Sequence, residues 1–208
     1  LDMISANGDG GEVQAIRHGY MRYTNQIHSY LSGLCDHDEL FTVFDQYRVL
    51  TATKHGKFGL NDMNTYISSH VAQVTGQDSR EWYVGRPIMI TENNYKLGLS
   101  NGDIGICLKH RENSGEFEVY FQSSNKWIST TRLPKSIQTA YAMTIHKSQG
   151  SEFGRVAVVL DDSEASSKVL SMELIYTAIT RAKNEIYLLA GDQALLTALT
   201  VKTTRQSG

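Results

Sequence analysis

Cysteine and proline are scarce in this sequence, and each occurs only twice among 208 residues. Cys35 and Cys107 lie far apart and belong to no CxxC pair, which argues against a disulfide scaffold and against a zinc site. No apolar run is long enough to span a membrane, and no signal peptide is visible. These absences favour a cytoplasmic protein with free thiols and no structural metal.

An excess of charge of one sign is missing as well. The 20 Lys and Arg residues and the 22 Asp and Glu residues give a formal net charge of -2, which excludes a chain that coats nucleic acid nonspecifically. Any contact with DNA must therefore be local and made by particular side chains. The composition is otherwise that of a globular protein, and the length suffices for one medium domain or two small ones.

The phosphate-binding loop GxxxxGK[ST] is the most informative absence. The nearest match, Gly56-Lys57, is followed by Phe58 instead of a hydroxyl residue and lacks a glycine at the required spacing. Without this loop, we expect that the 208 residues alone do not hydrolyse ATP. No Ser-His-Asp triad and no cluster of metal-ligand residues is evident, so no metal site is predicted in this chain.

The apolar pattern predicts an α/β framework. Buried strands are expected at 47–53, 155–161 and 185–190, and an amphipathic helix after the first has its apolar positions from Met63 to Val74 on one face. Strand, helix and strand near the C-terminus predict a parallel sheet with a right-handed crossover. The other expectations are a Gly-rich loop at 1–15, helices at 12–34 (with a break at Gly19 as one alternative), 39–46 and 169–182, and a last helix at 193–200.

Residues 86–131 have a different character, with short strands between turn signals. Asn101-Gly102 predicts a tight hairpin, because primed turns need positive φ at both central residues. Phe117, Val119 and Phe121 alternate and share one face. We expect a small antiparallel sheet or barrel, inserted into the α/β framework. Its strands are expected at 86–92, 103–109, 116–122 and 126–131, with further turns at 113–115 and 123–125.

Residues 142–153 form a dense polar run directly before an apolar strand. Hydroxyl, imidazole, ammonium and amide groups follow one another there, and such groups donate to the phosphate and sugar oxygens of nucleic acids. Gly150 would let the backbone approach a ligand closely. From composition alone, a polar connecting loop is the simpler interpretation.

Four stretches, in the same order along the chain, carry a resemblance to a known family. Residues 144–152 (Thr-Ile-His-Lys-Ser-Gln-Gly-Ser-Glu) resemble motif V of superfamily 1 helicases, and residues 176–183 (Tyr-Thr-Ala-Ile-Thr-Arg-Ala-Lys) resemble motif VI. Residues 86–105 are similar to the segment that leads into the family's small β-barrel, and residues 50–64 to its motif IV region. On these motifs the chain is identified as a member of the RecD-like branch.

The resemblance implies a RecA-like parallel-sheet motor domain of the α/β class, the second of a pair, with an inserted SH3-like β-barrel. The expected boundaries are an N-terminal helical or linker segment at 1–46, the motor domain at 47–83 and 135–208, and the barrel at 84–134. The P-loop domain would precede Leu1, so we expect the chain to be part of a longer protein.

The family pattern also implies nucleotide-binding residues. Arg181 matches the motif VI arginine that contacts the γ-phosphate and is the predicted catalytic residue, with a helix C-terminal cation as the alternative. Gly150 and Glu152 match motif V positions near the nucleotide. Lys54 stands where relatives often have an arginine near the phosphates, but it lacks the arginine fork, and an exposed loop lysine is an open alternative. The implied cofactors are ATP and Mg²⁺, the metal being held mainly by the P-loop domain.

The implied DNA-binding residues come from two stretches. Thr144, His146, Lys147 and Ser148 match the motif V face that meets single-stranded DNA. Asn93 and Asn101 match positions on the barrel side of the DNA path, although Asn101 could serve its turn alone. Three aromatic residues could stack on bases, and core packing is expected for at least two of them: Tyr95, Trp127 and Tyr141.

The resemblance is greatest to the exodeoxyribonuclease V alpha subunits, which implies a 5′-to-3′ ATP-dependent DNA helicase of double-strand break repair and recombination. The implied partners are single-stranded DNA and the beta and gamma subunits, with the nuclease in a partner because no carboxylate cluster here could hold catalytic metals. Two alternatives stay open. One is another RecD-like helicase of superfamily 1B, and the other is a non-catalytic module for DNA binding or subunit docking.

We predict weak binding of single-stranded DNA by these 208 residues alone. The reasons are the net charge of -2 and the expectation that half of the motor's DNA groove belongs to the other motor domain. Fluorescence anisotropy with a labelled oligonucleotide measures the affinity. A Kd equal to that of the complete protein would contradict the prediction.

Overall fold

The computed structural model describes residues 2–5, 11–56, 58–78, 81–160 and 170–190. Contacts divide the chain into two compact units. The first unit combines residues 1–19, 45–65 and 142–208, and the second combines residues 20–44 and 66–141. None of the helices in the described ranges is both long and apolar enough to cross a membrane.

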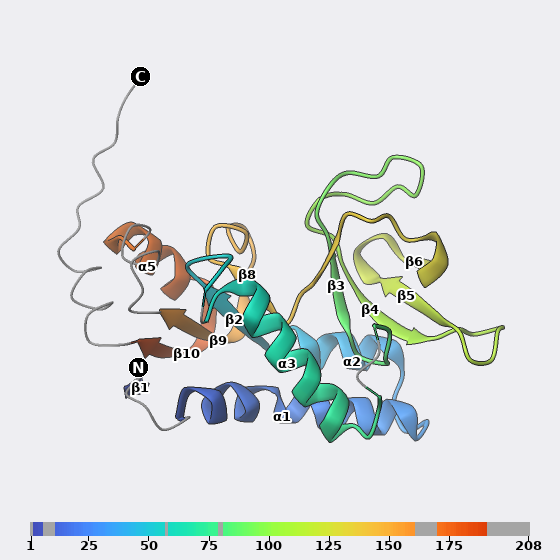
Figure 1. The fold of residues 1–208 in the computed structure, drawn as a ribbon, viewed down its shortest axis with the longest axis horizontal. Coiled ribbons are helices and arrows are strands. Elements are labelled where there is room, and N and C mark those ends of the chain that lie inside the picture. Colours follow the sequence, from blue (N-terminus) through green and yellow to red (C-terminus); the bar gives the residue numbers. More distant parts are fainter. Residues whose placement is uncertain (1, 6–10, 57, 79–80, 161–169, 191–208) are drawn as a thin grey trace. The chain divides into compact units, whose positions relative to one another are not determined.

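The first unit is built on a five-stranded sheet in the order β1-β10-β9-β2-β8 (Figure 1). All neighbouring strands in it are parallel. The parallel α/β sheet predicted from the sequence is therefore confirmed. Its strands are β1 (Asp2–Ser5), β2 (Tyr47–Thr51), β8 (Ala142–Thr144), β9 (Phe153–Leu160) and β10 (Ala182–Ala190).

Burial on both faces is the common feature of the central strands β2 and β9, and their sequences are mostly apolar, with Arg48 and Thr51 as buried polar residues of β2. Every residue of β2 is buried, and so is every residue of β9 except Arg155. A strand with neighbours on both sides in a parallel sheet has both faces covered, so its sequence does not alternate. The helix before β10, α5 (Met172–Ile179), is capped at its N-terminus by Ser171, whose side chain accepts from Leu174 N at 3.1 Å. It is shorter than predicted because Ala182 already begins β10.

Two strands of this sheet were not predicted. β1 lies where a loop was expected, and that prediction was wrong between Asp2 and Ser5, whose backbone pairs with β10. β8 has three residues and pairs with β2 inside the polar run that precedes β9. Both are short strands at the edges of the sheet, so no periodic pattern marks them. The helix predicted at 193–200 lies outside the described residues.

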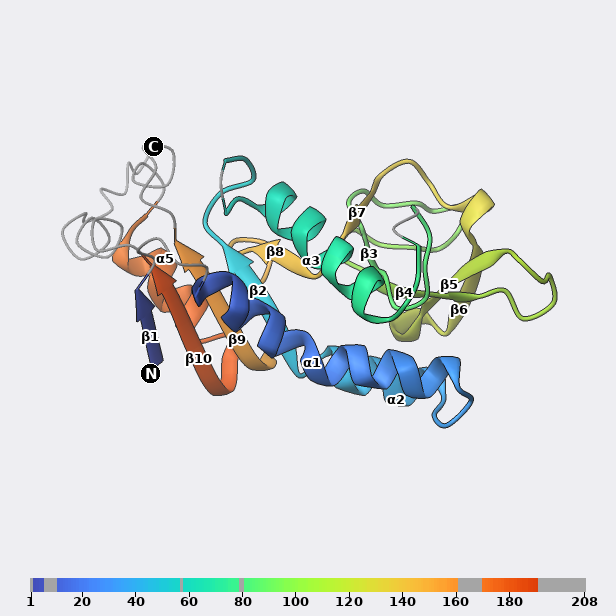
Figure 2. The same ribbon diagram turned by 60° about the horizontal axis from the view of Figure 1, so that its bottom comes forward.

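Helix α1 (Gly11–Leu31) is continuous, so the alternative of a break at Gly19 is wrong. Gly19 serves packing instead, because a Cβ at this position would come within 2.1 Å of the Tyr47 ring. The short helix expected next is present as α2 (His37–Phe44), and Figure 2 shows it beside the C-terminal half of α1. The rings of Tyr23 and Phe44 pack between these two helices with centroids 5.1 Å apart.

The second unit contains an antiparallel sheet in the order β6-β5-β4-β3-β7. The four strands predicted here are confirmed with slightly shorter limits, and β7 is an additional strand that pairs with β3. Val119 and Phe121 lie on the buried face with Phe117 packed against them, as the alternation predicted. The strands are β3 (Pro87–Ile90), β4 (Ile104–Lys109), β5 (Phe117–Phe121), β6 (Lys126–Ser129) and β7 (Ile137–Thr139).

The connection between β3 and β4 differs from the tight hairpin that was expected. The two strands pair, but residues 91–103 join them, and of the two turn residues only Gly102 has a positive φ, of 98°. Asp103 N donates to Ser100 O at 3.0 Å, which places Gly102 at the third position of a four-residue turn. Such a turn needs positive φ there alone, so Asn101 keeps an ordinary backbone conformation.

Both cysteines are free thiols, as the sequence predicted. Cys107 belongs to the apolar cluster of the second unit, and burial raises the pKa of its thiol to about 12. A thiol with so high a pKa is almost entirely protonated at neutral pH, so Cys107 acts as a small apolar core residue.

Asn64 fastens helix α3 (Leu60–Val74) to β8. Its Nδ2 donates to Ala142 O at 3.1 Å, and its Oδ1 accepts from Ala142 N at 2.8 Å. Asn64 is only 6% exposed, so these backbone groups have no ready replacement from solvent.

We predict that Asn64→Ala lowers the free energy of unfolding by about 2–4 kcal/mol, because it leaves two buried backbone groups without partners. Asn61→Ala, an exposed position on the same helix, is the matched control and should change it by less than about 0.5 kcal/mol. Urea denaturation measures both variants. Small and equal effects would show that Asn64 does not hold β8.

Candidate functional site

Residues 145–152 link β8 to β9 across the sheet. β8 ends at Thr144 beside Thr51, the last residue of β2, and β9 begins at Phe153 beside Ala182, the first residue of β10. Since β8, β2 and β9 are all parallel, the chain must return from the carboxyl edge of the sheet to its amino edge. The linking segment therefore has one end at each edge.

A capped turn forms at the carboxyl edge. The Thr144 hydroxyl accepts from Lys147 N at 3.2 Å, and the Thr144 carbonyl accepts from Ser148 N at 3.1 Å. Ser148 is fully buried, and its hydroxyl donates to Ile145 O at 2.7 Å. The structure thus exposes two of the four predicted motif V contacts to DNA, His146 and Lys147, half-buries Thr144 and buries Ser148.

The guanidinium of Arg181 lies at the other end of the segment. Its Nη1 donates to Ser151 O at 3.1 Å, and Phe153 N donates to Arg181 O at 2.8 Å. Its Nε donates to Thr177 O at 3.2 Å, at the end of α5, which is the contact expected of a helix C-terminal cation. Arg181 therefore bridges the end of α5 and the segment that carries motif V.

Gly150 and Glu152 flank the carbonyl that Arg181 contacts. Gly150 has φ 86°, and no heavy atom lies within 4 Å of where a Cβ would stand, so glycine is favoured there by backbone conformation. Glu152 Oε2 lies 3.7 Å from Lys183 Nζ, and both side chains are more than half exposed. Such a pair adds little stability. The sequence alone suggested no role for Lys183. Its position two residues after Arg181, inside the stretch that resembles motif VI, could have indicated that it lies near the same site.

Lys54 lies at the opposite edge of the sheet from Arg181. It follows β2, which ends at Thr51 beside Thr144, and it is exposed. Arg181 precedes β10, whose first residue pairs with Phe153 at the amino edge. No contact within the described residues joins Lys54 to Arg181, and the role of Lys54 at the phosphates stays a prediction.

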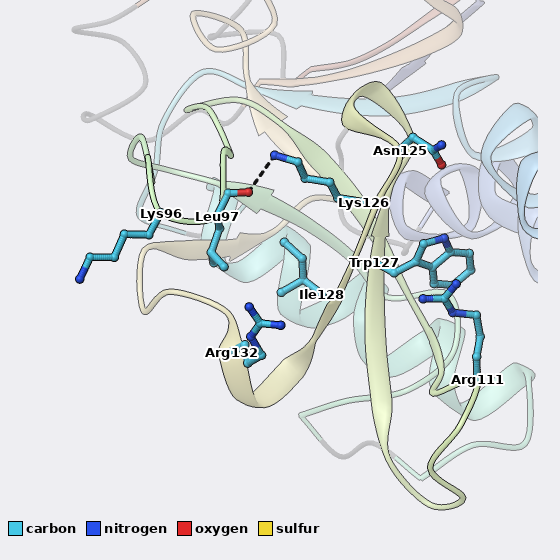
Figure 3. A pocket seen from close by; sticks show the side chains of 8 residues that line it. All are labelled: Lys96, Leu97, Arg111, Asn125, Lys126, Trp127, Ile128 and Arg132. Atoms are coloured by element: carbon cyan, nitrogen blue, oxygen red, sulfur yellow. Dashed lines mark hydrogen bonds between the residues drawn. The ribbon is translucent and has the colours of Figure 1, made fainter.

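In the second unit, the loop 91–103 brings Asn93 and Asn101 together. The Oδ1 of Asn93 accepts from Asn101 N at 2.8 Å, and both residues are exposed. Lys126 on β6 holds the same loop, because its Nζ donates to the carbonyls of Leu97 at 2.8 Å and Gly98 at 2.7 Å (Figure 3). The sequence analysis missed Lys126, since no local pattern links a strand lysine to a loop so far away in sequence.

The three candidate stacking aromatics differ in exposure. Tyr95 is 89% exposed, whereas Tyr141 is fully buried. Trp127 stacks on Tyr120 with ring centroids 4.5 Å apart, and the Arg111 guanidinium lies 4.0 Å from the centre of the Trp127 ring. Core packing was expected for at least two of the three, and the structure shows it only for Tyr141, because Trp127 is half-buried and Tyr95 has an accessible ring.

The arrangement in the first unit suits an anionic ligand at the amino edge. The guanidinium of Arg181 is held by the carbonyls of Thr177 and Ser151 and by the Thr180 hydroxyl, and its planar fork has the geometry that fits phosphate oxygens. The exposed ammonium of Lys183 lies close by, next to Glu152. Within the described residues, no group of three or more His, Cys, Asp or Glu side chains could hold a metal ion. The nucleotide role of these residues stays a prediction.

Two known families match separate stretches of the chain. The UvrD-like helicase C-terminal domain matches residues 139–189, which contain the stretches that resemble motifs V and VI. The ATP-dependent RecD-like DNA helicase SH3 domain matches residues 61–121, which include β3, β4 and β5. The first match falls mostly on the first unit, and the second falls mostly on the second unit.

Several curated proteins are similar over most of the chain. The RecBCD enzyme subunit RecD of Haemophilus influenzae is 38% identical over 168 residues, which are 79% of this chain and 24% of that protein. The RecBCD enzyme subunit RecD of Mycobacterium tuberculosis is 34% identical over 172 residues, 82% of this chain and 29% of that protein. The ATP-dependent RecD2 DNA helicase of Deinococcus radiodurans is 31% identical over 143 residues, 67% of this chain and 19% of that protein.

The chain spans less than a third of the length of these relatives. Among solved structures, the Pif1 helicase from Bacteroides in complex with ADP-AlF3 and ssDNA aligns with 80% of this chain and 48% of its own, at 15% identity and a TM-score of 0.48. The family matches and the curated relatives agree with the order of the motifs and with an SH3-like segment joined to a RecA-like α/β sheet. The chain belongs to the RecD family of DNA helicases and corresponds to the C-terminal region of its members.

Proposed function

We propose that this chain is the C-terminal motor part of an ATP-dependent 5′-to-3′ DNA helicase, the alpha subunit of exodeoxyribonuclease V. Residues 47–83 and 135–208 would form the motor domain and residues 84–134 the SH3-like barrel. The observation that supports the proposal is the contact of Arg181 Nη1 with Ser151 O, which joins the motif VI guanidinium to the motif V residue that separates Gly150 from Glu152 in the sequence.

Arg181 acts on the γ-phosphate of ATP bound between this motor domain and a P-loop domain of the complete protein. A fixed guanidinium neutralises the charge that develops on the transferred phosphoryl group. Mg²⁺, which the P-loop domain would mainly hold, would further neutralise the charge of the phosphates. A phosphate that takes over the Nη1 donor of Arg181 releases Ser151 O, so the nucleotide state changes the contacts of residues 145–152.

The capped turn at the other end of the same segment meets the DNA backbone. His146 and Lys147 present an imidazole and an ammonium to solvent, and both donate well to phosphate oxygens. Thr144 and Ser148 act through the turn, because the Thr144 hydroxyl caps it and the Ser148 hydroxyl closes it. Asn93 and Asn101 contribute polar contacts from the second unit.

The proposed partners are single-stranded DNA and the beta and gamma subunits of exodeoxyribonuclease V, in double-strand break repair and recombination. The similarity to RecBCD subunits from two organisms supports this choice. A RecD-like helicase that acts alone is the second candidate, and the match to the helicase of Deinococcus radiodurans favours it. A complete protein without GxxxxGK[ST] would point to a non-catalytic module for DNA binding or subunit docking instead.

We predict that Arg181→Ala in the complete protein lowers DNA-stimulated ATP hydrolysis by about a thousandfold or more, because an arginine at the γ-phosphate contributes that much to turnover. Nucleotide binding should persist. A steady-state ATPase assay, with equilibrium binding of a nucleotide analogue, separates the two effects.

Arg181→Lys tests the fork, since it keeps the charge and loses the bidentate geometry. Arg22→Ala, an exposed arginine on α1, is the control for loss of a positive charge. Turnover in Arg181→Ala that matches the control would remove the nucleotide role from Arg181. A complete wild-type protein without ATPase activity, alone and with its partners, would refute the helicase proposal.

A further prediction separates the two kinds of motif V residue. His146→Ala should weaken binding of single-stranded DNA and leave the unfolding free energy within about 0.5 kcal/mol, because the side chain is exposed. Ser148→Ala should lower stability by about 1 kcal/mol, since it removes a buried hydrogen bond. Anisotropy titrations and urea denaturation of both variants measure this. The reverse pattern would place the DNA contact at Ser148.

A further inference from the structure

A basic pocket lies on the second unit, between β6 and the loop 91–103 (Figure 3). Its cavity volume is about 420 Å³, within the range of sites that hold small ligands. Leu97 and Ile128 supply its apolar lining. The charged lining residues are all positive: Lys96, Arg111, Lys126 and Arg132.

Only one of these four cations has a carboxylate partner in the described part of the chain. Arg111 Nε lies 2.7 Å from Glu118 Oε1, and the Glu118 side chain is only 4% exposed. Lys96, Lys126 and Arg132 form no ion pair there. The pocket therefore has an uncompensated positive charge, although the whole chain has a net charge of -2.

Lys126 is built into the wall of this pocket. Its ammonium donates to Leu97 O and Gly98 O, and an ammonium has a third donor for a ligand. A Cβ at Gly98 would come within 2.2 Å of Lys126 Nζ, so this lysine lies directly against the backbone of Gly98. Gly98 also has φ 60°, a conformation that favours glycine. The positive φ is the reason for glycine at this position, and a side chain here would displace the end of Lys126.

An exposed aromatic ring stands on the same loop. Tyr95 is 89% exposed and directly precedes Lys96. Figure 3 shows Arg132 reaching toward Leu97 and Ile128, while Lys96 extends outward from the adjacent loop. An exposed ring beside several cations is the combination that binds single-stranded nucleic acid, since bases stack and phosphates pair with the cations.

We propose that this pocket is a phosphate subsite for single-stranded nucleic acid, an inference that rests on the proposed function. Arg132 contacts a phosphate in the pocket, and Lys96, which extends outward, contacts the next phosphate of the strand. Lys126 holds the loop in place and adds to the positive charge, and the neighbouring base stacks on Tyr95. An acidic peptide would also suit the cations, but it has no use for an exposed ring on the loop, so the nucleic acid is favoured. The subsite is separate from the motif V turn, which belongs to the first unit.

The test replaces both ligands, Lys96→Ala with Arg132→Ala, in the complete protein and measures the Kd for oligothymidylate in a salt series. Loss of two phosphate contacts should weaken binding by about tenfold and reduce the slope of log K against log salt by about 1.4. The matched control is Arg22→Ala with Lys109→Ala, which removes one arginine and one lysine at exposed positions outside the pocket. The control should keep the wild-type slope.

Tyr95 provides a second arm that does not involve charge. Tyr95→Ala should weaken binding by about tenfold, whereas Tyr95→Phe, which keeps the ring, should stay within about twofold of the wild type. Equal losses in both variants would show that the hydroxyl is the binding group and would overturn the stacking arrangement.

The possible failures are distinguishable. If the pocket variant keeps the wild-type Kd and slope while His146→Ala weakens binding, the subsite is refuted and the proposed function stands. If the wild-type protein does not bind single-stranded DNA, both fall. If polyglutamate binds the wild type but not the pocket variant while DNA binding is unchanged, the pocket serves an acidic protein, and the proposal is overturned.

Discussion

The return of the chain from one edge of the parallel sheet to the other is the constraint on which the rest of the first unit depends. Because β2 is parallel to both β8 and β9, residues 145–152 must run from the carboxyl edge of the sheet back to its amino edge. The Thr144 hydroxyl caps one end of this segment, and Arg181 contacts the carbonyl of Ser151 at the other. Hydrogen bonds therefore hold both ends of this short segment.

The sequence predicted those parts of the fold in which one physical effect dominates. Buried parallel strands and alternating antiparallel strands follow from burial alone, so β2, β9 and the four barrel strands were expected where they occur. β1 and β8 were missed because their pairing depends on neighbours far away in sequence. The possible helix break at Gly19 was wrong for the same reason. The glycine is needed there because the Tyr47 ring packs against it, and the local sequence does not reveal that contact.

The candidate site was predictable as a set of residues but not as an arrangement. The motifs predicted Arg181, Gly150 and Glu152 as site residues. In the structure, Arg181 contacts the carbonyl of Ser151, so all three lie at the same end of residues 145–152. The same motifs gave equal weight to His146 and Ser148, although only the first is exposed. Burial separates the two, and burial depends on tertiary packing. Lys126 had no motif at all, because its role depends on two carbonyls of a distant loop.

A net charge of -2 and several local cations are not in conflict. In the proposed function, the acidic residues would keep the chain as a whole from binding nucleic acid indiscriminately, while each cation near an exposed polar or aromatic group would add a contact for a strand. A few such contacts are weak one at a time. On one chain they raise each other's effective concentration for a strand that reaches several of them, so affinity depends on the strand's length and on salt. A motor that must release and rebind its track needs contacts of this kind, since a single strong site would hold the strand in place.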